Sequence, residues 1–121
     1  MKTINPSELS PMQVQMILQT AVAPRPIALA STIDKNGNVN LSPFSFFNLF
    51  SSNPPILIFS PARRVRDNST KDTLHNVLEV PEVVIGNVNF DMVQQVSLSS
   101  TEYETGVDEF IKSGLTKKPS E

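Results

Sequence analysis

Short runs of β-type residues, separated by glycine, asparagine and proline, dominate the middle of the chain. Ile27 to Ile33 is a mostly apolar run, and Val39 to Ser42 follows it after a turn at Asn36-Gly37. Two such runs around a glycine turn predict a β-hairpin, with a loop longer than the tightest two-residue type.

Two further strands and one aromatic segment are predicted beyond this hairpin. Ile56 to Phe59 is a short apolar run between proline-containing turns, which is typical of a buried strand. Val83 to Val88 is a run rich in β-branched residues and predicts another strand. The aromatic segment Phe44 to Phe50 predicts a turn or a short helix, in which we expect Phe47 and Phe50 to fill the core.

Two short helices are predicted before and after these strands. The first should run from Pro11 to about Thr20, capped by Ser7 or Ser10, and should pack on the sheet. The second should run from Lys71 to about Glu79, because the residue before Pro81 is pushed away from helical geometry. Its apolar face is expected to consist of Leu74, Val77 and Leu78.

The last third of the chain predicts two more short helices. Asp91 is the expected cap of a helix from Met92 to Val96, a polar loop should span Ser97 to Thr105, and Val107 to Lys112 should form a helix ending near Gly114. Because no long helices alternate with the strands, the pattern favours an α+β, mainly β fold. We expect an antiparallel barrel with short flanking helices, in one domain over residues 1–121.

Charge is spread unevenly along the chain. The formal net charge of -2 argues against a general nucleic-acid-binding protein. Between Arg25 and Asn76, however, six basic residues face only three acidic ones, and acids dominate after Asn76. A locally basic middle in an acidic protein suits one small anionic ligand.

Cysteine is absent and His75 is the single histidine, so disulfides, thiolate metal sites and a histidine zinc site are excluded. We interpret His75 as a surface residue in preference to a proton relay or a phosphate donor. No segment has the apolar core of a signal peptide or the length of a membrane span, which favours a cytoplasmic protein without a membrane partner.

The segment from Ser69 to Thr73 has two interpretations. Ser69 and Asp72 have the spacing of a capping box, which is a purely structural role. A helix start also offers free amides to a phosphate, to which Lys71 would add charge and Thr73 a hydroxyl donor. The nearby Arg63, Arg64 and Arg66 are interpreted mainly as a solvated loop, although Arg63 or Arg64 could reach the same phosphate.

Hydroxyl groups and aromatic rings gather in Ser42-Pro43-Phe44-Ser45-Phe46. Proline is unusual in a plain strand because it lacks a backbone donor, so this segment indicates more than core packing. The combination suits a flat ligand with polar edges. Arg25, held between two prolines, is equally compatible with a ligand contact and with a structural ion pair.

Five short motifs in order carry a family resemblance. They are PRPIA at Pro24 to Ala28, ST-D--G--NL at Ser31 to Leu41, PFSFF at Pro43 to Phe47, KDT--N from Lys71 to Asn76, and GVDEFIKSGL at Gly106 to Leu115. In these motifs the chain resembles the flavin reductase-like, FMN-binding split-barrel family, which includes the flavoredoxins.

The resemblance implies a split β-barrel that binds FMN, is a homodimer, and is reduced by NADH, NADPH or a partner electron carrier. It assigns no metal and no specific catalytic residue. The glycines at positions 37, 86, 106 and 114 are too dispersed for a G-x-G-x-x-G motif, so a nicotinamide donor would bind without a Rossmann site. The implied FMN contacts are Arg25, Ser31, Thr32, Ser42, Pro43, Phe44, Ser45, Phe46, Ser60, Arg63, Lys71, Asp72, Thr73 and Asn76.

Two other functions remain open from the sequence. The protein could bind flavin without turning anything over, as a carrier or sensor, or it could be an incomplete barrel module without ligand. Family members generally continue past the segment that ends at Leu115 into further strands. We therefore expect either a shortened product of a longer protein, lacking the C-terminal strands, or a sheet that closes against a partner subunit.

Overall fold

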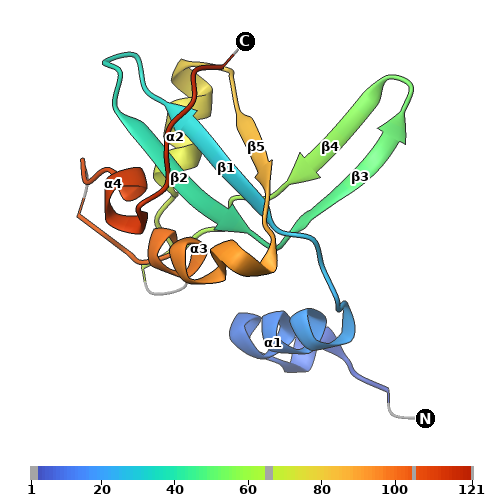
Figure 1. The fold of residues 1–121 in the computed structure, drawn as a ribbon. Coiled ribbons are helices and arrows are strands. Elements are labelled where there is room, and N and C mark those ends of the chain that lie inside the picture. Colours follow the sequence, from blue (N-terminus) through green and yellow to red (C-terminus); the bar gives the residue numbers. More distant parts are fainter. Residues whose placement is uncertain (1–2, 65–66, 105, 121) are drawn as a thin grey trace.

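Strand β1 (Ala28–Ile33) is the centre of the larger sheet. In the computed structural model, which describes residues 3–64, 67–104 and 106–120, β1 pairs antiparallel with β2 (Val39–Phe44) on one side and with β5 (Val84–Asn87) on the other. The predicted hairpin is confirmed, and its second strand extends through Pro43 to Phe44. Figure 1 shows the three strands side by side.

Pro43 fits into β2 because β2 is an edge strand. The backbone N–H of Leu41 donates to the carboxylate of Glu109 and not to β1. Since backbone groups alternate in direction along a strand, the N–H position of Pro43 also points away from β1. A missing donor there removes no hydrogen bond from the sheet.

The two faces of this sheet are covered differently. On one face, Ala28, Ala30 and Phe44 form a buried apolar cluster, and helix α2 (Asp72–Glu79) packs on β1 and β2. On the other face, Leu29 and Leu41 pack against helix α3 (Val93–Ser99), and helix α4 (Glu109–Ser113) adds further apolar contacts. β1 is therefore covered on both sides, since the consecutive residues Ala28, Leu29 and Ala30 are all buried.

A second sheet has two strands, β3 (Phe47–Ser52) and β4 (Pro55–Phe59). Figure 1 shows this hairpin extending away from the first sheet. The predicted turn or short helix in the aromatic segment is therefore wrong, because its residues pair with β4. The strand prediction for β4 is confirmed but its burial is not, since Leu57 is 51% exposed. Phe47 packs on the core as expected, whereas Phe50 is 65% exposed and does not.

The described residues form no closed barrel, because they contain only the three-stranded and the two-stranded sheet. Fold class is thus a mixture of helices and antiparallel strands, as predicted, without the predicted closure. No described helix is long and apolar enough to cross a membrane.

Helix α1 (Pro11–Ala21) follows the short 3₁₀ helix η1 (Pro6–Glu8), and its predicted cap is confirmed. The Ser10 hydroxyl accepts from the Gln13 N–H, and the Gln13 side chain accepts from the Ser10 N–H. The predicted packing of this helix on the sheet is wrong, since none of its residues is buried and it lies apart from the strands (Figure 1).

The C-terminal helices follow the prediction with shifted starts. Asn89, and not Asp91, caps the 3₁₀ helix η2 (Phe90–Met92), which continues into α3 as far as Ser99. The expected polar loop therefore starts within a helix. Helix α4 ends at Gly114, whose positive φ of 69° is the left-handed conformation that glycine adopts at helix ends.

Candidate functional site

Helix α2 is fastened to the sheet by two buried pairs of polar side chains. The amide of Asn40 on β2 donates to the Thr73 hydroxyl over 2.9 Å, and the amide of Asn76 donates to the Thr32 hydroxyl over 3.1 Å. All four residues are buried, and Thr73 is only 1% exposed. Because buried polar groups are costly to leave unpaired, these bonds fix the position of α2 over β1 and β2.

The start of α2 differs from the predicted capping box. Lys71 is the cap residue and makes no side-chain cap bond, while the Ser69 hydroxyl accepts from the Arg64 guanidinium over 3.3 Å. Arg64 also donates to the Thr70 carbonyl over 2.5 Å and forms an ion pair with Asp72 at 3.3 Å. The guanidinium thus takes the place of the predicted Ser69–Asp72 pair and is held at the helix start.

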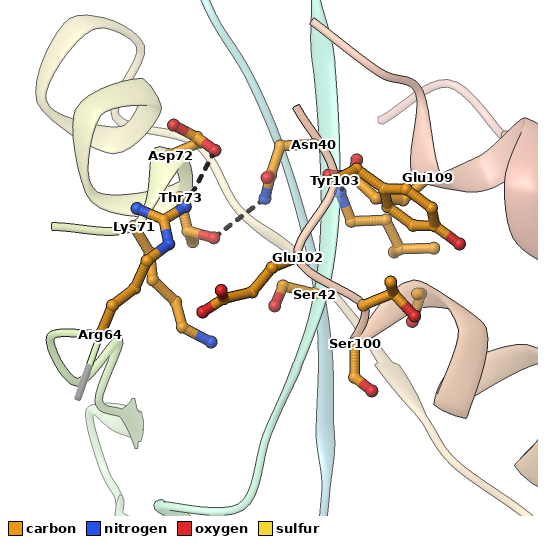
Figure 2. A pocket seen from close by; sticks show the side chains of 13 residues that line it. Asn40, Ser42, Arg64, Lys71, Asp72, Thr73, Ser100, Glu102, Tyr103 and Glu109 are labelled. Carbon is orange, nitrogen blue, oxygen red and sulfur yellow. Dashed lines mark hydrogen bonds and ion pairs between the residues drawn. The ribbon is translucent and has the colours of Figure 1, made fainter. Parts of the chain in front are cut away.

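A polar hollow of about 100 Å³ lies at the free edge of β2, between the start of α2 and the α3–α4 connection. Figure 2 shows Arg64, Lys71 and Asp72 on one side of β2 and Tyr103 and Glu109 on the other. Its lining residues are Asn40, Leu41, Ser42, Arg64, Lys71, Asp72, Thr73, Ser99, Ser100, Thr101, Glu102, Tyr103 and Glu109. The hollow therefore combines two cations and three carboxylates with several hydroxyl groups.

Lys71 is half-buried beside this hollow, and its ammonium lies 5.0 Å from the centre of the Phe44 ring. Burial lowers the pKa of Lys71, and the charge of Arg64 lowers it further, whereas Glu102 acts in the opposite direction. A desolvated ammonium next to a second cation is stabilised by an added anion. This is the electrostatic environment expected of an anion-binding group.

Glu109 lies across β2 from Lys71 at the start of α4. Its carboxylate accepts the backbone N–H of Leu41 over 3.1 Å, which occupies one free donor on the edge of β2. Burial raises the pKa of Glu109, and the nearby carboxylates of Asp72 and Asp108 raise it further, against hydrogen bonds that lower it. A partly buried carboxylate therefore faces the same hollow as the two cations.

Of the predicted FMN contacts, Ser42, Lys71, Asp72 and Thr73 line the hollow together. Thr32 and Asn76 instead bond to each other between β1 and α2. Phe44 is buried in the core with its ring under Lys71, and Ser31 lines a separate shallow hollow with residues 117–120. The structure thus brings the β2 and α2 parts of the prediction together.

The remaining predicted contacts lie elsewhere. Arg25 donates to the carbonyls of Gln19 and Val22 at the end of α1. Ser60 donates its N–H to the Phe46 carbonyl at the base of the β3–β4 hairpin, over 2.9 Å. Pro43, Ser45 and Arg63 are absent from the lining of this hollow, and Arg66 lies outside the described residues.

Arg64 is the arginine of its cluster that lines the hollow, whereas Arg63 donates to the Asn68 carbonyl at the surface. Sequence reasoning left this choice open and did not propose Ser99 to Tyr103 or Glu109. The only available signal for Glu109 was its place in the GVDEFIKSGL motif. His75 is exposed, as predicted, and its Nε2 lies 2.6 Å from the Thr70 hydroxyl.

No family model matches the sequence. An uncharacterized protein of Aquifex aeolicus is 42% identical over 99 residues, covering 82% of this chain and 50% of that protein. An uncharacterized protein of Halalkalibacterium halodurans is 39% identical over 118 residues, covering 98% of this chain and 56% of that protein. The chain therefore spans about half the length of the curated relatives that it matches.

Solved structures resemble the chain over nearly its whole length. Nitrilotriacetate monooxygenase component B from Bacillus cereus matches with a TM-score of 0.92 and 29% identity, over 100% of this chain and 59% of that one. The 2-nitrobenzoate 2-nitroreductase NbaA of Pseudomonas fluorescens matches with a TM-score of 0.83 and 28% identity, over 99% and 56%. Flavoredoxin of Desulfovibrio vulgaris shares the fold, with a TM-score of 0.70 and 21% identity, over 83% and 51%. These neighbours confirm the resemblance that the five motifs indicate.

Proposed function

We propose that this chain, whose structural neighbours are flavin reductase-like split-barrel proteins, binds FMN with its phosphate in the hollow at the edge of β2. The observation that carries this proposal is the convergence of Arg64 and Lys71 on a hollow that also holds the Ser42 hydroxyl. The whole protein then acts as a flavin-dependent oxidoreductase.

The residues of the hollow fit a phosphate group. Two cations and the hydroxyls of Ser42, Ser100 and Thr101 offer the donors that phosphate oxygens accept. A volume of about 100 Å³ is the space of a few water molecules, which suits a compact anion and not a three-ring system. We therefore assign the phosphate to the hollow and the flavin ring to the surface beside it.

The surface assigned to the ring is the end of β2 and the segment that follows. Pro43, Ser45 and Phe46 lie there, and β2 is an edge strand of its sheet. When bound, FMN supplies the redox chemistry of the reaction. The role of this chain is to bind and orient it, with Lys71 and Arg64 as the charged contacts.

Electrons reach the flavin from NADH, NADPH or a protein carrier in this proposal. The alternative is a flavin-binding carrier or sensor that does not turn over. Anaerobic mixing of the FMN-loaded protein with NADH and with NADPH separates the two, because rapid bleaching of the flavin absorbance is expected only of a reductase. Absence of bleaching with either nucleotide would favour a carrier or sensor, or reduction by a protein partner.

A homodimer is the proposed assembly. The family resemblance implies it, and the β3–β4 hairpin offers the surface, since Leu49, Phe50, Ile56, Leu57 and Ile58 are each 40% to 65% exposed. Light scattering of the wild type and of a Phe50→Ser, Leu57→Ser double variant tests this surface. The variant should be monomeric at concentrations at which the wild type is dimeric.

The phosphate contact is tested by comparing FMN with riboflavin in fluorescence titrations. A hydrogen bond to a charged group contributes about 1.5 to 3 kcal/mol, so loss of the ammonium in Lys71→Met should weaken FMN binding roughly 10-fold to 150-fold. Riboflavin, which lacks the phosphate, should be affected much less. Arg63→Met is the matched control, because it removes one positive charge from the same segment outside the hollow. Equal losses for both ligands, or for both variants, would contradict the proposal.

A further inference from the structure

Carboxylates around the hollow partly compensate its two cations. Arg64 and Lys71 supply two positive charges, whereas Asp72, Glu102 and Glu109 supply three negative ones when all are ionised. Arg64 is already paired with Asp72 at 3.3 Å, and the charge of Glu102 acts on Lys71. The positive charges that a phosphate dianion would meet are therefore already compensated by carboxylates. Binding of the dianion would be favoured if one of these carboxylates lost its negative charge.

Glu109 is the carboxylate best placed to lose its charge. It is partly buried, its hydrogen bond to the Leu41 N–H comes from a neutral donor, and among the described residues it has no ion pair. Burial and the charges of Asp72 and Asp108 already raise its pKa. Asp72, by contrast, has Arg64 as a partner.

We propose that Glu109 takes up one proton from solvent when a phosphate group binds in the hollow, so that ligand binding and protonation of this residue are coupled. The proposal rests on the proposed FMN site. The proton moves from bulk water to one oxygen of the Glu109 carboxylate, and the other oxygen continues to accept the Leu41 N–H. Neutralisation removes the repulsion between this carboxylate and a phosphate in the hollow that Glu109 lines.

Other titratable groups near Glu109 could also take up a proton, and their contribution must be distinguished from that of Glu109. Strand β2 and helix α3 contain none. On α4 itself Asp108 is paired with Lys117, and Lys112 is exposed. The groups on the other surrounding elements are Asp34, Arg64, Lys71, Asp72, His75, Glu79, Glu102, Tyr103 and Glu104. A pH dependence of binding alone would not identify Glu109 among them, and neither would the titration of the phosphate itself.

Glu109→Gln isolates the residue, because glutamine is close in shape, still accepts a hydrogen bond and cannot ionise. All other titrations, including that of the phosphate, are common to both proteins and cancel in the ratio of their affinities. Glu82→Gln is the matched control, since it makes the same change of net charge at an exposed position outside the hollow. Riboflavin is the matched ligand without the phosphate.

FMN binding is measured by calorimetry in pairs of buffers with different ionisation enthalpies, over a series of pH values. The wild type should take up to one proton more per FMN bound than Glu109→Gln does. The ratio of the FMN affinity of Glu109→Gln to that of the wild type should be near one at acid pH. As the pH rises, this ratio should increase by up to about tenfold per pH unit and then level off. Glu82→Gln should behave as the wild type, and riboflavin should show no difference between the proteins.

An affinity ratio that is independent of pH, with equal proton uptake by the wild type and Glu109→Gln, would overturn the coupling while leaving FMN binding intact. Proton uptake of the same size with riboflavin would also overturn it, because the uptake would not depend on the phosphate. Absence of FMN binding by the wild type at every pH would instead overturn the proposed function, and this inference with it. The two failures are therefore distinguishable.

Discussion

The three-stranded sheet and the β3–β4 hairpin are both built from short apolar strands, but only the first has both faces covered. Leu41 on β2 is 2% exposed, whereas Leu57 on β4 is 51% exposed. The difference does not arise from the residues of the strands. It arises because α2 packs on one face of the larger sheet and α3 and α4 pack on the other.

The two regions also differ in how they use polar side chains. In the larger sheet, Asn40 and Thr32 are buried and bonded to α2, so polar residues hold a helix in place. On the hairpin, large apolar residues face outward, which is typical of a surface that another chain or segment covers. One region thus uses polar side chains to hold a helix in place, and the other leaves large apolar side chains exposed.

The largest expected effect on stability is seen when one leucine in each region is replaced by alanine. Leu41→Ala should lower the free energy of unfolding by about 2 to 5 kcal/mol, because it leaves a cavity in a packed core. Leu57→Ala should change it by only about 0.5 kcal/mol in the monomer, because the side chain is already half in water. Urea unfolding at low protein concentration measures both.

A loss for Leu57→Ala that equals that of Leu41→Ala would break the comparison, because the hairpin would then be as buried as the sheet. A loss of stability in Leu57→Ala that grows with protein concentration would sharpen the comparison, because it would show that a second copy of the chain covers the hairpin.

A smaller effect is expected at the bonds that fasten α2. Thr73→Val keeps the shape of the side chain but leaves the Asn40 amide without its acceptor, which should lower the free energy of unfolding by about 1 to 3 kcal/mol. Thr73→Ser is the control, since it retains the hydroxyl. A loss for Thr73→Ser as large as that for Thr73→Val in urea unfolding would contradict the prediction, because Thr73→Ser keeps the hydroxyl that accepts from Asn40.

The same variants test whether Thr73 positions the site or binds the ligand. If Thr73 acts by fixing α2, Thr73→Val should weaken FMN and riboflavin to a similar extent. A loss confined to FMN would support the direct phosphate contact that the sequence predicts for Thr73.

The smallest effect is expected in the turn between β1 and β2. The Asp34 carboxylate accepts from the Asn36 N–H, the Asn38 N–H and the Asn38 amide, each over 2.8 Å. These bonds, led by the Asn38 side chain, lower the pKa of Asp34. Because the folded-state pKa lies below the unfolded one, the stabilisation is present at neutral pH and is lost as the pH falls through the folded-state pKa.

Asp34→Asn should therefore unfold at a lower urea concentration than the wild type at neutral pH, and the difference should shrink in acid. A difference that stays constant down to acid pH would show that the charge of Asp34 does not contribute. The β3–β4 turn at Asn53 and Pro54 provides the comparison, because a substitution there should show no such pH dependence.

The sequence alone determined those elements that depend only on residues close together along the chain. The β1–β2 hairpin follows from its strand residues and the glycine turn, the start of α1 follows from Ser10 and Pro11, and the end of α4 follows from Gly114. The five motifs likewise indicated the family, because each is a short stretch of sequence. Their order along the chain predicted the family resemblance that the solved structures confirm.

Only the tertiary structure decided which side chains meet. Asn76 stands in one motif with Lys71, yet Asn76 bonds to β1 while Lys71 lines the hollow, because successive residues at a helix point in different directions. Arg64 and Arg63 are adjacent and chemically identical, and only packing places one at the site. The exposure of β4 and the position of Glu109 beside the hollow depend on contacts between segments far apart in sequence. Strand periodicity contains no information about which of these contacts form.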